Sequence, residues 1–268
     1  NKKEILDNVI NDREPKGPKD IHNFYPKLEN LEHLSENSVL IKISFTLKKP
    51  YTSKDEGEFY LLEWKEKERG KKVIKQKIIE NPIVRDKFTG LPIVRPSTWK
   101  GHLRFAAERV EWEDDKEKRK IIKRLFGSNP EEDELLKGRL YLFPTFFKEE
   151  AERDVITPLK RDTRTPTKRG PIPLEVMKPG KEGKFHILYI PYPKGKNFKE
   201  EQIKEDLKFL AEALELMFYT YGFSAKKTSG FGVVEPLKEE DVQIYPEERK
   251  EVFSILYTKH NNSVKDSA

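Results

Sequence analysis

The chain has 268 residues and a formal net charge of +6, and 37% of its residues are charged, against about 25% in an average soluble domain. Its 11% of aromatic residues and its periodic apolar segments argue against a disordered chain. The absence of cysteine excludes disulfides, thiolate catalysis and cysteine-ligated zinc, and no run of about 18 apolar residues predicts a membrane span. We therefore expect one cytoplasmic domain over residues 1–268, with the dense ionic surface that is typical of thermophile proteins.

The first half of the chain predicts a strand followed by two helices. Residues 1–38 are polar and interrupted by prolines, which indicates an N-terminal extension. Residues 39–47 alternate apolar and polar, as a half-buried strand does. Residues 51–80 form a charged insertion, and residues 81–97 are rich in turn residues.

Two helices are expected next. Ser97 is a suitable N-cap, and apolar residues at helical spacing extend the first helix to about Trp112. The second helix covers Lys116–Phe126 and ends at Gly127. A strand follows over residues 139–147, in which a proline marks a bulge or an edge.

The remaining elements complete an α+β pattern. Residues 155–174 enclose a very basic segment whose prolines and threonines predict a loop or ribbon rather than a helix. A strand over 184–192, an amphipathic helix over 203–221 closed by Gly222, and a final strand over 230–235 follow. This order is typical of a ferredoxin-like fold, an antiparallel sheet with helices on one face.

Three basic segments suit phosphate binding, and the first is residues 95–104 (RPSTWKGHLR). The N-terminus of a helix offers free backbone N–H groups with a partial positive charge, two basic side chains one turn apart add full charges, and a glycine allows close approach. A capped helix with solvated basic residues is the alternative. The expected contacts are Ser97, Thr98, Lys100, Gly101 and Arg104.

The second segment, residues 157–171, carries five cations against a single acid. Such an excess of positive charge favours contact with a phosphodiester backbone, although a solvated surface loop is the alternative. The expected contacts are Lys160, Arg161, Arg164, Lys168 and Arg169.

The third segment, residues 225–234 (AKKTSGFGVV), places a Gly-x-Gly sequence after two lysines. A glycine hairpin without a ligand is the alternative. If the sheet brings the three segments together, they form one groove for nucleic acid, with Tyr51, Phe59 and Tyr60 available to stack on bases at its rim. The expected contacts in the third segment are Lys226, Lys227, Gly230 and Gly232.

These segments resemble, in order, the motifs of the RAMP superfamily of CRISPR-associated proteins. Residues 90–104 are similar to the G-x-P-x-x-P-x-S-S-x-K-G-x-x-R signature, with Thr98 and Trp99 as departures, while residues 159–185 and 226–234 resemble the family's central and glycine-rich segments. The matching residues are Gly90, Pro92, Ser97, Lys100, Gly101, Arg104, Arg164, Gly170, Glu175, Gly183, Phe185, Gly230 and Gly232.

The resemblance implies an RRM-like, ferredoxin-like core that binds CRISPR RNA and target RNA beside other subunits of a type III (Csm or Cmr) effector complex. It implies that residues 157–171 act as a thumb between bases, and that a loop aspartate after the first strand cuts target RNA with Mg²⁺ or another divalent metal. Asp55 matches as catalytic residue and metal ligand, with Glu56 and Glu58 as helpers. The family's glycine-rich approach is replaced here by residues 51–54, and a plain charged turn is the alternative.

Two other functions stay open. A RAMP-type endoribonuclease that processes guide RNA would use a His or Tyr general base, and His102 lies in a phosphate-binding motif. A serine acyl enzyme would use Ser97 and Lys100 as an S-x-x-K pair, with residues 227–230 imitating a K-T-G box, but the S-x-N element is missing between them. Apart from the divalent metal, no cofactor and no membrane partner are expected.

Overall fold

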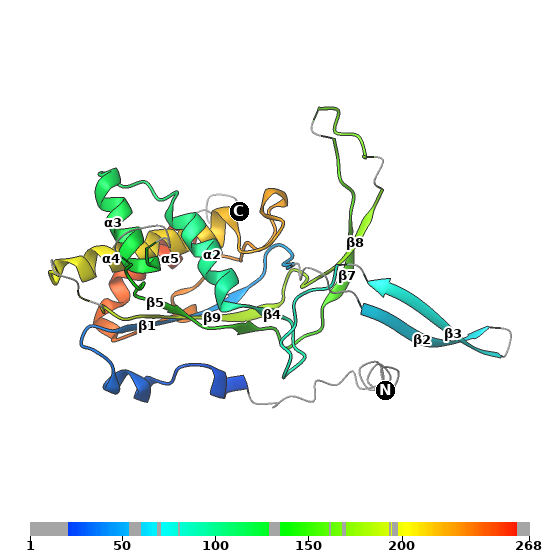
Figure 1. Ribbon diagram of the computed structural model, residues 1–268, viewed down its shortest axis with the longest axis horizontal. Coiled ribbons are helices and arrows are strands. Elements are labelled where there is room, and N and C mark those ends of the chain that lie inside the picture. Colours follow the sequence, from blue (N-terminus) through cyan, green and yellow to red (C-terminus); the bar gives the residue numbers. More distant parts are fainter. Residues whose placement is uncertain are drawn as a thin grey trace.

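A four-stranded antiparallel sheet forms the centre of the fold, with its strands in the order β10-β1-β9-β5 (Figure 1). Its strands are β1 (Val39–Thr46), β5 (Leu140–Leu142), β9 (Glu182–Tyr189) and β10 (Val242–Tyr245). Helices lie between β1 and β5 and between β9 and β10 along the chain, which gives the β-α-β-β-α-β order of ferredoxin-like folds. The fold class expected from the sequence is confirmed.

The computed structural model of the protein describes most of the chain. The described residues are 21–53, 60–68, 71–79, 81–128, 135–160, 162–167, 170–192, 194 and 198–261. None of the helices within these residues combines the length and the apolar character that a membrane span requires.

One face of the sheet is covered by helices (Figure 1). They are α2 (Pro96–Ala107), α3 (Asp115–Phe126), α4 (Glu201–Glu215) and α5 (Ile255–Asn261). Because side chains alternate along a strand, every second residue of β1 and β9 lies in the core beneath these helices. These core residues are Val39, Ile41, Ile43, Phe45, Phe185, Ile187 and Tyr189.

The amphipathic helix predicted over residues 203–221 ends at Gly222, as the sequence predicts. After α4 the chain continues as a π-helical segment, Leu216–Tyr221, and Gly222 ends it. The chain then reaches β10 through the short 3-10 helix Glu239–Asp241, and a further 3-10 helix, Glu247–Phe253, leads into α5. The predicted helix over residues 116–126 is likewise present as α3, with Gly127 after its last residue.

A buried carboxylate on α4 ties the helices to the sheet. Asp206 has no exposed surface and accepts hydrogen bonds from Arg124 of α3 at 2.8 Å and from Arg139 at 2.7 Å. The hydroxyl of Tyr189 on β9 donates a third at 3.0 Å. A buried charge is tolerated when it is paired and hydrogen-bonded in this way, so these contacts fix α3 and α4 over β9.

Two antiparallel ribbons project from the sheet region (Figure 1). One, β2 (Tyr60–Glu68) with β3 (Lys71–Ile79), lies within the charged insertion. The other, here called the thumb ribbon, consists of β7 (Glu152–Ile156), β8 (Ile172–Val176) and the basic segment between them. The thumb ribbon extends toward the side of the sheet that carries the helices.

The predicted start and end of the first helix are wrong. The N-cap residue is Arg95 rather than Ser97, and α2 begins at Pro96, because proline at the first helical position has a suitable φ and needs no N–H partner. The helix ends at Ala107, five residues before Trp112.

Two predicted strands also need correction. Residues 139–147 do not form one strand, because the chain divides around Pro144 into β5 and β6 (Thr145–Phe146), and β6 pairs with β4 (Ile93–Val94) instead of β9. The final strand predicted over 230–235 is wrong: Gly230 and Gly232 have φ values of 74° and 80°, outside the range of a strand. The fourth strand of the sheet is β10.

Residues 21–38, here called the N-terminal strap, lie along the outer face of the sheet, opposite the helices (Figure 1). The strap contains two 3-10 helices, Ile21–Phe24 and Leu28–His33. Between them, the ring of Tyr25 stacks on His186 of β9 with the ring centroids 4.2 Å apart. The strap therefore covers part of the sheet surface that an RRM uses to stack bases.

We predict that Asp206→Ala lowers the free energy of unfolding by about 3–5 kcal/mol, because Arg139 and Arg124 would be left as buried charges without their common partner. Urea unfolding followed by circular dichroism measures this. The control is Glu205→Ala, which removes the half-exposed partner of Arg124 and should cost less than about 1 kcal/mol. Equal losses in both variants would contradict the role of Asp206.

Candidate nucleic-acid interface

The first basic motif is positioned by a buried tryptophan within it. Trp99 has no exposed surface and contacts the rings of Phe185 and Phe223 at 4.7 and 4.4 Å between centroids. Its indole N–H donates a hydrogen bond of 3.1 Å to Thr145, whose hydroxyl donates to the Lys184 carbonyl at 2.7 Å. The first turn of α2 is therefore fixed by contacts in the core.

Because Trp99 points inward, its neighbours on α2 face solvent. Ser97, Lys100 and Gly101 are exposed, while Thr98 and Arg104 are half-buried. Arg104 forms an ion pair of 3.3 Å with Glu108 one turn later. The side chain of the N-cap residue, Arg95, does not cap the start of α2. The first N–H groups of such a helix end can attract an anion.

The third motif forms a tight loop, residues 222–234, here called the glycine-rich loop. Gly222 and Gly232 have positive φ, and a Cβ on Gly232 would lie 2.6 Å from the backbone nitrogen of Ser224. The loop therefore closes on itself only because these two positions lack side chains. Gly230 ends the short 3-10 helix Lys227–Ser229 in the left-handed conformation.

The structure brings the first and third motifs together at an aromatic ring. Lys227 of the glycine-rich loop places Nζ 3.4 Å from the ring centroid of Phe105 on α2, and the guanidinium carbon of Arg109 lies 3.5 Å from the same centroid. Both cations are therefore within the range of a cation–π interaction with the same ring. Burial, and then the charge of Arg109, lower the pKa of Lys227.

His102 lies one turn before Phe105 and is half-buried beside this contact. Its Nδ1 atom has no hydrogen-bond partner within the described part of the chain. Burial and the nearby charge of Lys227 lower the pKa of His102 to about 4. The imidazole is therefore neutral at physiological pH.

Residues 50–53 connect the glycine-rich loop to the base of the thumb ribbon. Ala225 donates its backbone N–H to the Thr52 carbonyl at 3.1 Å, and the Thr52 hydroxyl donates to the Glu175 carbonyl of β8 at 2.8 Å. Tyr51 exchanges two backbone hydrogen bonds with Met177, at 2.8 and 2.9 Å. The glycine-rich loop is thus joined to the base of the thumb ribbon, although not to the basic motif near its tip.

Two of the sequence predictions concern residues 50–53 and the residues that follow them. Tyr51 is fully buried, so the expectation that it stacks on bases at a rim is wrong. Asp55, with Glu56 and Glu58, lies outside the described residues. The last described residue before them, Ser53, accepts a hydrogen bond of 2.9 Å from the backbone N–H of Val84.

The described residues near the tip of the thumb ribbon include exposed cations in a turn. Lys160 and Arg164 are both exposed, and the N–H of Arg164 donates to the Lys160 carbonyl at 3.1 Å. Arg164 has a φ of 55°, a conformation that is uncommon for a residue with a side chain. Exposed Leu159 lies beside these cations. Three further predicted contacts lie outside the described residues: Arg161, Lys168 and Arg169.

The structure unites only part of the predicted groove. The base of the thumb ribbon joins the glycine-rich loop, but the tip stands well apart from α2 (Figure 1). Sequence reasoning missed Phe105, Arg109 and Tyr221, whose ring meets that of Phe105 edge-on at 5.4 Å. The available signal was the four-residue spacing of Phe105 and Arg109 within the helix predicted to reach Trp112.

These observations define a class of protein. It is an α+β protein with a ferredoxin-like core and a basic face built from a helix and a glycine-rich loop. A family model of the RAMP superfamily matches residues 75–235, more than half of the chain. The chain belongs to the RAMP superfamily.

One solved structure shares the fold at low sequence identity, and a second is reported beside it. A chain in the cryo-EM structure of the type III-B Cmr-beta complex bound to cognate target RNA has 17% identity and a TM-score of 0.51, and the match covers 91% of this chain and 72% of that one. A chain of a type IV-B CRISPR complex has 13% identity and a TM-score of 0.41, with 78% and 90% covered. A search of the curated proteins finds no match.

The described residues contain no group of three or more His, Asp or Glu side chains that could hold a metal ion. The expected metal ligand, Asp55, is not among these residues.

We predict that acid destabilises the protein in part through His102 and His186, whose pKa values burial lowers to about 4. The unfolded chain binds these protons near pH 6.5, so the free energy of unfolding falls as the pH drops from about 6.5 toward 4. Urea unfolding at pH 7 and pH 5 measures the loss. The loss of unfolding free energy between pH 7 and pH 5 should be smaller in His102→Gln than in the wild type by more than about 1 kcal/mol.

The matched control for this measurement is His33→Gln, because His33 is exposed. An identical pH dependence in the wild type, His33→Gln and His102→Gln would show that His102 does not titrate in this way.

Proposed function

We propose that this chain is an RNA-binding subunit of a type III CRISPR effector complex, where it holds CRISPR RNA for pairing with target RNA in antiviral defence. The observation that carries the proposal is the meeting of the glycine-rich loop with α2 at Phe105, where Lys227 and Arg109 are held close together. The likeness to a chain of a Cmr complex bound to target RNA supports the same function.

The electrostatics of this contact favour a polyanion. The pKa of Lys227 is lowered because burial and Arg109 both disfavour its charged form. A phosphate group near the two cations would relieve this repulsion, whereas a neutral ligand would not. Exposed Lys100 and Lys226 extend the positive charge along the same helix and loop, as a phosphodiester backbone requires.

The thumb ribbon suits a different contact with the same RNA. Its exposed Leu159 and Val155 are apolar, and Lys160 and Arg164 lie near the tip. Apolar side chains can separate stacked bases while neighbouring cations bind the phosphates. We therefore propose that the tip inserts between bases of an RNA bound along α2 and the glycine-rich loop.

We predict that the double variant Lys100→Glu/Arg164→Glu binds single-stranded CRISPR RNA at least about tenfold more weakly at 0.1 M salt, and that the slope of log K against log salt falls by about 2. Fluorescence anisotropy at several salt concentrations measures both. The control, Lys148→Glu/Lys184→Glu, changes the net charge equally at exposed sites around the outer face of the sheet. The proposed RNA face comprises α2, the glycine-rich loop and the thumb ribbon. If both variants bind RNA like the wild type, this proposal is wrong.

RNA cutting is a further part of the proposal, and it rests on the resemblance of Asp55 to the family's loop aspartate. The last residue described before it, Ser53, accepts a hydrogen bond from Val84 and follows Thr52, whose hydroxyl donates to the Glu175 carbonyl at the base of the thumb ribbon. A carboxylate at Asp55 would hold Mg²⁺ or another divalent cation, and the metal would polarise the phosphate or activate the attacking 2′-hydroxyl.

We predict that Asp55→Ala abolishes metal-dependent cleavage of target RNA by the assembled complex and leaves guide binding unchanged. Gel analysis of labelled target RNA, with and without EDTA, measures cleavage. The control is Asp162→Ala, at an exposed aspartate of the thumb tip. Full cleavage by Asp55→Ala would refute its role.

A metal-independent guide-processing nuclease is the second candidate, favoured by one observation: His102 is neutral and lies beside Lys227. A neutral imidazole can accept a proton from a 2′-hydroxyl while an ammonium group stabilises the phosphate. Cleavage of precursor guide RNA that survives EDTA and is lost in His102→Ala would establish this function.

The serine acyl-enzyme alternative gains no support from the geometry. Lys227, the first residue of the segment that imitates a K-T-G box, meets α2 at Phe105, eight residues after Ser97. Eight residues of helix span about 12 Å, so the two elements do not converge on one serine.

A further inference from the structure

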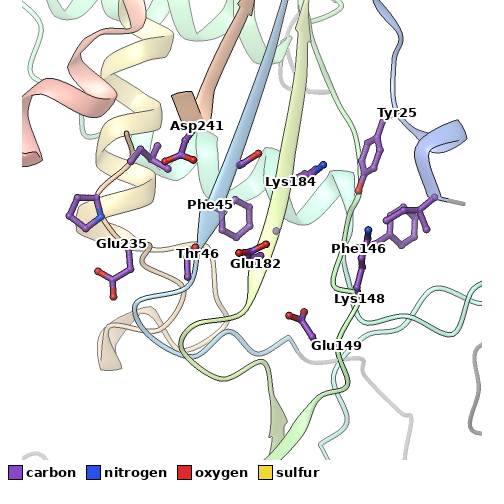
Figure 2. Close-up of a pocket in the computed structure, with 15 residues that line it drawn as sticks. Tyr25, Phe45, Thr46, Phe146, Lys148, Glu149, Glu182, Lys184, Glu235 and Asp241 are labelled. Carbon is purple, nitrogen blue, oxygen red and sulfur yellow. The ribbon is translucent and has the colours of Figure 1, made fainter. Parts of the chain in front are cut away.

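The outer face of the sheet carries a pocket of about 420 Å³ (Figure 2). Ser44 and Thr46 of β1 and Lys184 of β9 lie on its floor, at positions that alternate with the core residues. The start of the N-terminal strap and residues 235–241 form its sides. This volume lies within the range of about 300–1,000 Å³ that ligand pockets occupy.

Two aromatic rings, Phe146 and Phe24, here called the aromatic ledge, lie at one side of the pocket. Phe146 lines the pocket, and the ring of Phe24 lies 5.5 Å from that of Phe146. Phe24 is nevertheless 40% exposed. A large exposed apolar side chain beside a pocket is typical of interaction sites, where it becomes buried against a partner.

The charges around the pocket determine which charge its partner should carry. Four carboxylates and two ammonium groups line it, and Glu149, Glu182 and Glu235 form no ion pair within the part of the chain that the structure describes. Figure 2 shows Glu149 and Glu182 on neighbouring parts of the pocket. This excess of negative charge repels the phosphates of RNA and attracts basic side chains.

We propose that this pocket is the docking site for a basic segment of a different protein subunit, which inserts an aromatic or aliphatic side chain against Phe146 and places lysine or arginine residues beside Glu182 and Glu235. The site lies on the face opposite the helices, whereas the proposed RNA contacts lie on α2 and the glycine-rich loop (Figure 1). The inference therefore goes beyond RNA binding, and this chain would bind RNA and protein on separate faces.

Short labelled peptides test this chemistry directly. The probe is a capped pentapeptide with two lysines on each side of a phenylalanine, and its comparison peptides replace the phenylalanine by alanine or the lysines by glutamates. We expect fluorescence anisotropy to show sub-millimolar binding of the probe, binding at least about threefold weaker for the alanine peptide, and none for the glutamate peptide.

Charge reversal in the full-length protein locates the binding. Glu182→Lys/Glu235→Lys should weaken the probe at least about tenfold, because attraction to two lysines becomes repulsion. The matched control, Glu111→Lys/Glu113→Lys, makes the same charge change at exposed residues outside the pocket lining and should bind within about twofold of the wild type. Phe24→Ala, a smaller change at an exposed side chain, should also weaken the probe if the ledge takes part.

Several results would overturn the proposal. These are undetectable binding of the probe at 1 mM, equal weakening in the two double variants, or competition between the probe and oligouridylate for the pocket. Self-association in sedimentation velocity that disappears in Glu182→Lys/Glu235→Lys would assign the pocket to a second copy of this chain instead. RNA affinity that stays normal in this variant separates failure of the docking site from failure of the RNA face.

Discussion

The burial of Trp99 is the constraint on which the basic face depends. Its indole lies among aromatic rings of the core and is hydrogen-bonded to Thr145, so the first turn of α2 has one possible rotation about its axis. Successive helical residues are about 100° apart, and the inward direction of Trp99 therefore turns Lys100 and Gly101 toward solvent.

The contact at Phe105 combines attraction with repulsion. Each of the two cations gains from the electron-rich face of the ring, while burial, and after it the charge of Arg109, lowers the pKa of Lys227. The ring holds Lys227 and Arg109 at fixed places before any ligand arrives. Because the ring already orders these two side chains, they lose less conformational entropy when an anion binds, which favours its affinity. The glycine-rich loop reaches this ring because Gly222 and Gly232 let its backbone pack closely.

The sequence predicts those elements that have a strong period and misses those defined by partners far along the chain. The alternation of β1 and the amphipathic patterns of α3 and α4 identify these elements directly, since burial on one side imposes the period. β10 has only four residues, and its pairing with β1 cannot be seen locally. Gly230 and Gly232 look like part of a strand beside two valines, but their positive φ is a tertiary feature. The motif residues on α2 were predicted, whereas the meeting of Lys227 with Phe105 depends on the fold.

The net charge of +6 conceals a separation of charge between the faces of one sheet. On the helix side, lysine and arginine residues gather where α2 meets the glycine-rich loop. On the outer side, the lining of the pocket carries more carboxylates than ammonium groups, next to exposed Phe24. Under the proposed function, this distribution would direct a polyanion to the helix side and a basic segment to the pocket, since the field of each face influences which ligand approaches it. A subunit that must hold RNA while it contacts other proteins requires this polarity, because an evenly basic surface would let RNA compete for every docking site.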